Sequence, residues 1–311
     1  MNGNKTYMQK ADLEVADLIA DGGYLPDERA AEFIRNVIKE SVLLKSIQVI
    51  GMKSHTKILD KVGFQGRILK PAVSGVALPA GDRVKPTTGR VEMTTELFKG
   101  ECRLNDEVLE DNIENGNFKT TVMQMMAEQI SLDLDDLAAN GDTASADPFL
   151  AKVDGMRKLA VSHIVNAGTT ALSKSYLKSA VKKMPSQYNR NKAAHQFMTS
   201  EMAEIDYRDY LADRMTAVGD RFLTEDVPVR YANRPIMPVP VFPDDLGVGN
   251  NCTDVLLMDP KTAVFGFWRR IQLETARDAH SGEWCLIATV RCGFCYQEED
   301  AVVKIINVKT Q

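Results

Sequence analysis

The sequence has no segment that predicts export or insertion into a membrane. No run approaches the ~20 apolar residues that a membrane-spanning helix needs. The first ten residues are polar and lack the apolar centre of a secretory signal. Five cysteines are an odd number in a chain without an export signal, so we expect reduced thiols in a cytoplasm rather than a disulfide framework.

Basic charge is also scarce. Lysine and arginine number 38 against 43 acidic residues, which gives a formal net charge of -5. A protein that grips DNA or RNA is expected to be basic, because phosphate neutralisation supplies most of the affinity. The acidic balance therefore predicts a chain that can surround nucleic acid without holding it.

Motifs that carry chemistry are largely missing. The four histidines are far apart and form no H-E-x-x-H or similar pair. Residues 247–249 begin like a phosphate-binding loop, but Cys252 stands where a third glycine would be and no G-K-S/T follows, so we expect a turn. No G-x-S-x-G elbow is present. The sequence predicts no catalytic residue, no cofactor and no metal site.

Two groups of residues are candidate chemical sites. Cys292 and Cys295 form a C-x-x-C pair, but the alternating apolar residues of 284–296 predict a strand, in which positions three apart point to opposite faces. We therefore interpret both as buried structural thiols. Asp133, Asp135 and Asp136 stand near the end of a predicted helix, where adjacent side chains diverge, and a solvated acidic face is the interpretation that we favour.

The strongest predicted helix begins at Phe118 and ends at Asn140-Gly141. Apolar residues recur there at steps of four and three. At ~1.5 Å per residue, its roughly 22 residues would run ~33 Å, long enough to be the backbone of the subunit. Residues 1–25 are polar and predict an arm, and Pro26 with the apolar stripe that follows predicts a first helix.

The second half of the chain alternates predicted helices and strands. Residues 172–188 and 200–215 are predicted to be helical, with a short strand at 196–199 between them. The proline-rich segment 231–243 is expected to be extended and not to sit centrally in a sheet.

Between Lys53 and Leu104 the pattern changes to β-structure. Residues 91–97 alternate as in a half-buried strand, and a bulge is expected after Gly100, where the alternation changes phase. Residues 62–90 are rich in glycine and proline and contain few residues that could form a core. They predict a long two-stranded arm that projects from the body. An isolated hairpin is marginal in water, so this arm should lie on something else.

Charges of the two signs are separated along this region. Residues 61–90 carry six basic residues against one acid, and residues 101–114 carry six acids against one arginine. A basic arm beside an acidic segment suggests docking between neighbouring copies; two solvated surfaces of opposite sign remain the alternative. The candidate interface residues are Arg67, Lys70, Arg83, Lys85, Arg90, Glu107, Glu110 and Asp111.

Several stretches, in this order, resemble the major capsid protein family of tailed bacteriophages, which has the Hong Kong 97 type of shell fold. Each stretch is weak alone, and their shared order over residues 25–308 carries the resemblance. The stretches are 97–100 with 105–111, 137–142, 154–156, 238–240 with 243–244, 264–266, and 289–293 with 300–303.

The resemblance implies an α+β fold and a division of the chain into six parts. These are an N-terminal arm (1–25), an N-terminal helix and lead-in (26–52), an extended β-hairpin loop (53–104), a peripheral domain with the spine helix (105–152), an axial α/β domain (153–283), and closing strands that return to the peripheral domain (284–311). The extended loop would lie over the neighbouring copy.

The resemblance also implies a function without catalysis. Copies would assemble into pentamers and hexamers of an icosahedral shell around double-stranded DNA, in the virion of a tailed phage assembled in the host cytoplasm. Portal and decoration proteins are implied partners, and so is a separate scaffolding protein because only about 25 residues precede the first predicted helix. Crosslinking through Lys70 or Lys85 of the loop stays open.

The sequence leaves two other interpretations of the function open. An encapsulin-type nanocompartment shell has the same fold but encloses enzyme cargo instead of a genome. An unrelated cytoplasmic α/β enzyme would need a pocket with convergent titratable groups.

Overall fold

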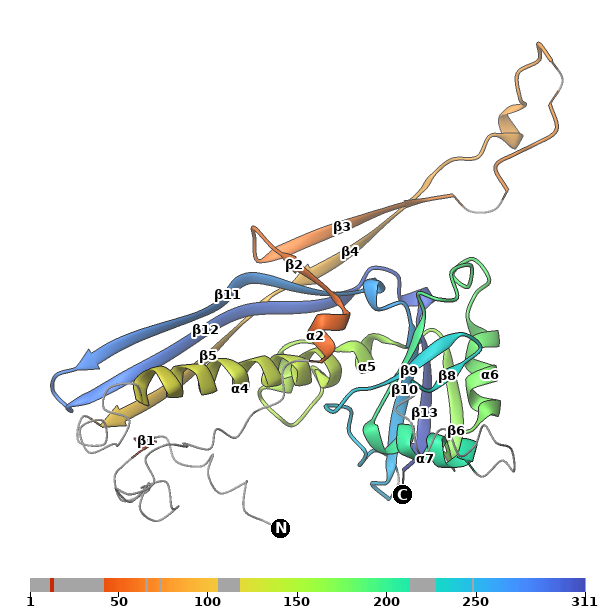
Figure 1. Cartoon of the computed structure of the whole chain (residues 1–311). Helices are drawn as coiled ribbons and strands as arrows, with labels where there is room; N and C mark the ends of the chain where they lie inside the picture. Colours follow the sequence, from red (N-terminus) through yellow and green to blue (C-terminus); the bar gives the residue numbers. More distant parts are fainter. Residues whose placement is uncertain are drawn as a thin grey trace.

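The structure, a computed structural model, describes residues 12–13, 42–64, 67–72, 74–105, 118–212, 228–247 and 249–310. Within them are two sheets, a separate two-stranded ladder and one long helix (Figure 1). The predicted helix from Pro26 lies outside the described residues, as does the predicted N-terminal arm apart from strand β1 (Asp12–Leu13).

The first sheet has five strands in the order β1-β5-β12-β11-β2. Their bounds are β2 (Gln48–Gly51), β5 (Glu96–Asn105), β11 (Ala263–Asp278) and β12 (Glu283–Tyr296). β12 confirms the long strand expected over 284–296, and its even-numbered side chains from Leu286 to Tyr296 are buried. Period-two burial of this kind requires a layer on that face of the sheet.

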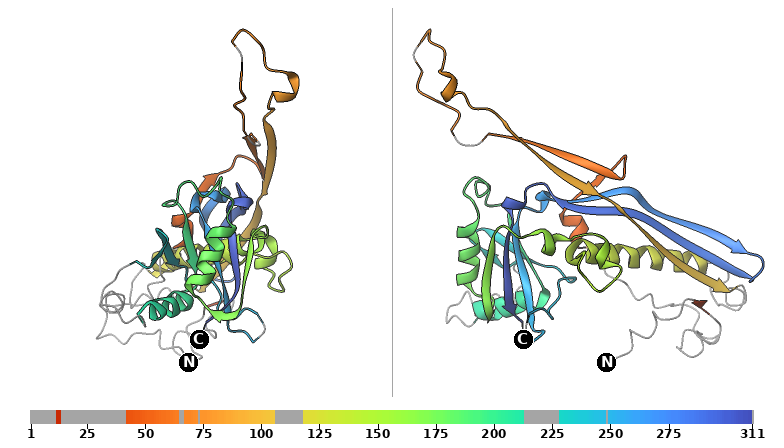
Figure 2. Two further views of the ribbon diagram at one scale, coloured as in Figure 1. Left: turned by 90° about the vertical axis from the view of Figure 1, so that its right-hand side faces the viewer. Right: turned by 180° about the vertical axis from the view of Figure 1, so that it is seen from behind.

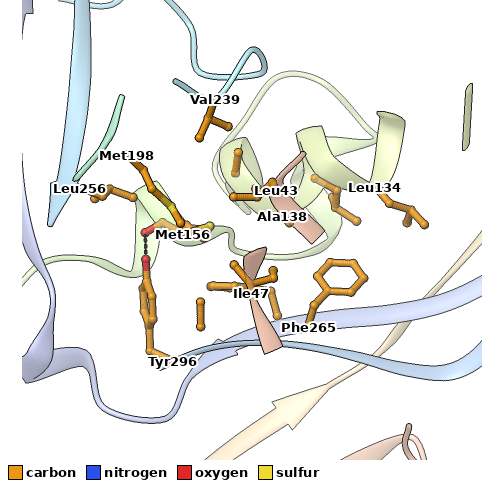
Figure 3. Packing of buried hydrophobic residues seen from close by; sticks show 14 of the residues in the cluster. Leu43, Ile47, Leu134, Ala138, Met156, Met198, Val239, Leu256, Phe265 and Tyr296 are labelled. Carbon is orange, nitrogen blue, oxygen red and sulfur yellow. Dashed lines mark hydrogen bonds between the residues drawn. The ribbon is translucent and has the colours of Figure 1, made fainter. Parts of the chain in front are cut away.

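That layer is the spine helix α4 (Phe118–Asn140), whose predicted bounds are confirmed. It runs along the sheet (Figures 1 and 2). Its C-terminal half supplies Leu134, Leu137 and Ala138 to the main core, together with residues of the short helices α2 (Leu43–Ser46) and α5 (Met156–Leu159). Figure 3 shows this packing, in which the Tyr296 hydroxyl donates a hydrogen bond of 2.9 Å to the carbonyl of Met156.

Glycine ends α4 because no side chain fits there. A Cβ at Gly141 would lie 2.2 Å from the carbonyl oxygen of Val153. The N–H of Gly155 donates to the carbonyl of Gly141 at 2.8 Å, so two backbone segments run in direct contact. Gly141 therefore both ends the helix and allows two backbone segments to approach each other closely.

The second sheet has six strands in the order β6-β13-β10-β7-β9-β8. Their bounds are β6 (Ile164–Ala171), β7 (Gln196–Thr199), β8 (Arg230–Tyr231), β9 (Arg234–Pro238), β10 (Cys252–Met258) and β13 (Val303–Lys309). Helices α6 (Lys174–Lys183) and α7 (Glu201–Ala212) both contribute to the core on one face, while Met198 and Leu256 face the main core on the other.

The predicted elements of this region are present, but the expectation that the proline-rich segment 231–243 would not sit centrally in a sheet was wrong. The strand at 196–199 is confirmed, and both helices form. Helix α6 is shorter than predicted, while the predicted end of α7 falls among residues 213–227, which lie outside the described part. Ser200 caps α7 by accepting a hydrogen bond of 3.3 Å from the N–H of Ala203. Strand β9, from the proline-rich segment, has neighbours on both sides; its prolines fall at its second and last residues, where few ladder bonds are lost.

The sheets do not follow the six-part division expected from the sequence. Strand β11, expected in the axial part, pairs with β12 in the five-stranded sheet. Strand β13, expected to return to the peripheral domain, pairs with β10 and β6 in the six-stranded sheet. The long β11–β12 ribbon and β13 thus connect the two sheets, because strand partners are chosen by register and burial and not by order in the chain.

The third β-structure is a hairpin of β3 (Thr56–Gly63) and β4 (Thr87–Thr94). Figures 1 and 2 show it leaving the body and ending in a long loop that includes a short 3-10 turn (Ala80–Asp82). The bulge expected after Gly100 was wrong, since β5 pairs with β12 without interruption from Glu96 to Asn105. The change of phase occurs at Thr95, between β4 and β5, and it leaves Leu97 half-exposed.

Candidate assembly surface

The outer part of the hairpin exposes large apolar side chains. Leu69 is 84% exposed and Val62 is 71% exposed, and Phe64, Ile68 and Val76 are each at least half-exposed. Such a group on a thin projection has no core of its own to enter (Figure 2). Several large apolar side chains exposed on one short segment indicate an interaction site. The sequence interpretation missed these residues; their signal was large apolar side chains in a glycine- and proline-rich stretch.

The inner part of the hairpin is anchored firmly to the body. Met93 is buried against Met52, Val264 and Cys295. A Cβ at Gly293 would lie 1.9 Å from the carbonyl oxygen of Thr94, so only glycine allows β12 to pass this close beneath the hairpin. The anchored base holds the described residues of the distal loop (64, 67–72 and 74–86) away from the body of the subunit (Figures 1 and 2).

All five candidate basic residues of the hairpin are exposed, but they differ in their local partners. Arg90 lies 3.3 Å from Asp60 across the ladder, and Lys70 lies 3.7 Å from Asp82. Arg83 donates a hydrogen bond of 3.1 Å to the carbonyl of Leu78. Arg67 and Lys85 have no ion-pair partner among the described residues, and both are exposed on the distal loop.

The acidic half of the predicted interface cannot be placed. Glu107, Glu110 and Asp111 lie outside the described residues. The neighbouring Glu101 pairs within its own strand, with Lys99 at 2.9 Å and Arg103 at 3.1 Å. Hydrogen bonds from Lys99 and then Arg103 hold the pKa of Glu101 below its usual value. The pairing of arm and acidic segment therefore stays a prediction.

The interpretation of Asp135 as part of a solvated acidic face was wrong. Its side chain is 2% exposed, and its carboxylate accepts hydrogen bonds from the N–H groups of Val42 at 3.0 Å, Leu43 at 3.4 Å and Leu44 at 3.0 Å. It fastens the start of α2 to the spine helix. Asp133 on the same helix is exposed and hydrogen-bonds only Gln129. Helical spacing alone does not distinguish the two.

The C-x-x-C pair is arranged as the strand pattern predicted. Cys292 belongs to the main core and Cys295 to the cluster beneath the hairpin, on opposite faces of β12. Both are free thiols. Burial raises the pKa of Cys292 to about 12 and that of Cys295 to about 11. Neither is poised for redox chemistry, because the thiolate is the reactive form.

We expect the native chain to show two classes of thiol. At pH 8 a disulfide reagent should react with the half-buried Cys102 and Cys285 at least about tenfold faster than with Cys292 and Cys295, because thiolate formation and access both limit the rate. Raising the pH towards 10 should reduce the difference in reaction rate, first for Cys295, because its pKa is lower than that of Cys292. Mass spectrometry of timed samples identifies each site. Equal rates in the folded chain would contradict the assignment.

A cavity of about 390 Å³ lies between the hairpin base and residues 143–159. Two of its carboxylates are committed to local structure. Asp154 accepts from the N–H and hydroxyl of Thr143, both at 2.9 Å. Burial opposes ionisation of Glu299, but hydrogen bonds from Ser162 and Val161 outweigh it and hold the pKa of that carboxyl below its usual value. This arrangement orders loops and does not present a general base.

The described part of the chain has neither a group of metal-binding side chains nor a membrane-spanning helix. There, no three His, Cys, Asp or Glu side chains lie where they could share a metal ion. None of the helices there is long and apolar enough to cross a membrane. Gly247 and Gly249 both lie in a turn and have positive φ, as expected.

Comparisons with known proteins agree on one family. The model described as "Phage capsid family" matches residues 22–306. A relative named "Putative prophage capsid protein YqbE", from Bacillus subtilis (strain 168), is 34% identical over 310 residues, which is 98% of this chain and 99% of the relative.

Solved structures share the fold at low sequence identity. The capsid of a native GTA particle matches with a TM-score of 0.64 and 16% identity, covering 94% of this chain and 99% of its own. A chain of Mycobacterium phage Adephagia matches with a TM-score of 0.62 and 13% sequence identity. The match covers 95% of this chain and 98% of the phage chain. The SrpI encapsulin of Synechococcus elongatus PCC 7942 matches with a TM-score of 0.59 and 11% sequence identity. The match covers 96% of this chain and 97% of the encapsulin chain.

Proposed function

This chain belongs to the phage capsid family, and on that premise we propose that it is the major capsid protein that forms the icosahedral shell around the double-stranded DNA genome of a tailed phage. The predicted α+β, Hong Kong 97 type fold is confirmed by the likeness to capsid structures. Members of this family are structural components of virions that assemble from copies of themselves, so catalysis is not their role. What we propose beyond family membership is the double-stranded DNA genome, the tailed phage and the icosahedral geometry of the shell.

The observation that carries the proposal is the projecting hairpin. It projects from the body (Figure 1), and the described residues of its distal part include exposed apolar and basic side chains. An isolated two-stranded ribbon is marginal in water, so a neighbouring copy must supply the missing surface. We propose Arg67, Lys70, Arg83, Lys85 and Arg90 as the basic side of this contact, and Glu107, Glu110 and Asp111 as its acidic side.

The charge balance supports enclosure of DNA without tight binding. A net charge of -5 repels a phosphate backbone at long range, which leaves a packaged genome mobile. We further propose that the spine-helix sheet forms the peripheral domain and the six-stranded sheet the axial domain, with portal, decoration and separate scaffolding proteins as the partners that a phage head requires. Assembly would take place in the host cytoplasm.

Electron microscopy of the purified protein tests the proposal. The full chain should be expressed alone and together with the products of the genes beside its own, because a scaffold can be required for closure. We expect closed shells that sediment as very large particles. A small, uniform oligomer under every one of these conditions would overturn the proposal.

The second candidate is an encapsulin-type compartment, which the likeness to the SrpI encapsulin favours. The two functions differ in what the shell encloses. Particles isolated from the native host should hold nuclease-protected double-stranded DNA if the chain is a phage head protein. A stoichiometric enzyme cargo without DNA would establish the encapsulin function instead.

A further inference from the structure

Charge on the six-stranded lobe is divided between its two covering helices. From residue 155 to residue 200 the sequence contains no acidic residue, and eight lysines and arginines. Helix α7 follows at once with four acids in its twelve residues. The net charge of the whole chain hides this separation, and no residue of either helix entered the predicted interface.

The basic surface is a stripe along α6. Lys174, Lys178 and Lys182 recur every four residues, which places them in one row, and all three are exposed. The opposite side of the helix is packed, with Leu177 and Ala180 buried against the sheet. At ~1.5 Å per residue, Lys174 and Lys182 are ~12 Å apart along the helix.

The acidic surface is a stripe along α7 that also carries apolar side chains. Glu201, Ile205 and Asp209 recur every four residues, and all three are exposed. Beside them, Met202 is 49% exposed and Tyr210 is 40% exposed. Glu201 and Asp209 are ~12 Å apart, the same spacing as the two outer lysines of α6. Ile205 would then face Lys178, whose aliphatic stem can cover it.

The two stripes do not face each other within one subunit. Both helices cover the same side of the sheet, but their axes run in different directions (Figures 1 and 2). Bringing α7 alongside α6 therefore requires a second copy that is rotated relative to the first. A contact between two different surfaces is heterologous, and a rotation that closes turns such a contact into a ring.

We propose that the acidic and apolar face of α7 docks on the lysine stripe of α6 in the next copy, and that this contact forms the ring of each capsomer. Lys174 and Lys182 pair with Glu201 and Asp209 across the boundary. Met202, Ile205 and Tyr210 are covered by the neighbour. The proposal rests on the shell function given above and assigns a second interface, separate from the hairpin.

A charge exchange in the full-length chain tests the inference. One variant carries K174E and K182E, a second carries E201K and D209K, and a third carries all four changes. The third keeps the net charge of the chain and restores complementarity across the contact while reversing its sign. We expect each two-site variant to lower the shell yield at least about tenfold and the four-site variant to recover most of it. Sedimentation and electron microscopy measure the yield.

The outcomes are distinct. Shells from both two-site variants at the wild-type yield would overturn the inference, and so would failure of the four-site variant to exceed them. The inference would also fail if the K174E/K182E variant assembled normally but bound double-stranded DNA more weakly in a gel-shift assay, because the lysine stripe would then face nucleic acid. Absence of shells from the unchanged chain, both alone and together with the products of the neighbouring genes, would instead reject the shell function itself.

Discussion

A subunit whose residues 64–86 are replaced by a two-residue Asn-Gly turn is expected to fold and to form no closed shell. The ladder register pairs Gly63 with Thr87, so a tight turn can close the hairpin at its last pair. The buried base around Met93 is untouched. The lost part carries Phe64 and Leu69, and burying such a side chain stabilises a contact by about 1.5–3 kcal/mol.

The expected effect is therefore large at every subunit boundary. Circular dichroism and thermal unfolding should show a folded subunit, while sedimentation should show species no larger than single capsomers. Closed shells from this variant would contradict the idea that each copy completes the arm of its neighbour.

A charge-reversal variant separates the basic groups from the apolar ones. R67E, R83E and K85E together should weaken assembly more at low salt than at high salt, because screening reduces charge pairing between exposed groups. R90E alone should weaken assembly less than any one of these three changes, since Arg90 already pairs with Asp60 of its own hairpin. If the triple variant assembled equally well at all salt concentrations, charge pairing by the arm would be excluded.

The replacement of Asp135 by alanine is expected to give the largest loss of stability from one side chain. It would leave the N–H groups of Val42, Leu43 and Leu44 without their acceptor at a buried site. Unsatisfied buried donors are costly, and we expect the free energy of unfolding to fall by about 3 kcal/mol or more. Asp135→Asn keeps one carbonyl acceptor and should lose less.

Urea unfolding in the arm-replaced subunit measures this effect without a contribution from shell contacts. Asp133→Ala is the matched control on the same helix, because Asp133 is exposed and should change stability by no more than about 0.5 kcal/mol. Equal losses from the two alanine variants would show that Asp135 has no special role. Loss of the α2 anchor should also expose Leu43 and Ile47, two residues of the main core (Figure 3).

Elements with strong periodicity were predictable from the sequence. The spine helix α4 and the long strand β12 have the expected bounds within a residue, because a buried face fixes their spacing. The divergence of Cys292 and Cys295 followed from the same period. The projecting hairpin was predictable because glycine, proline and charge leave residues 62–90 without a core.

Other features depended on contacts between distant residues. The change of strand phase lies at Thr95 and not after Gly100, since it is set where β4 leaves the sheet and β5 joins β12. Asp135 was mistaken for a surface acid because its three donors are more than ninety residues away. The apolar residues of the arm looked unremarkable until their exposure was known.

The sequence alone determined where the spine helix, the long strand and the projecting hairpin lie, and the order of the predicted segments was enough to indicate a shell protein. These properties depend on local spacing and composition, which act between residues close in the chain. Only the tertiary structure decided which strands share a sheet, which carboxylate is buried, and which faces of α6 and α7 are left for another copy. Those depend on long-range packing, in which similar local patterns receive different neighbours.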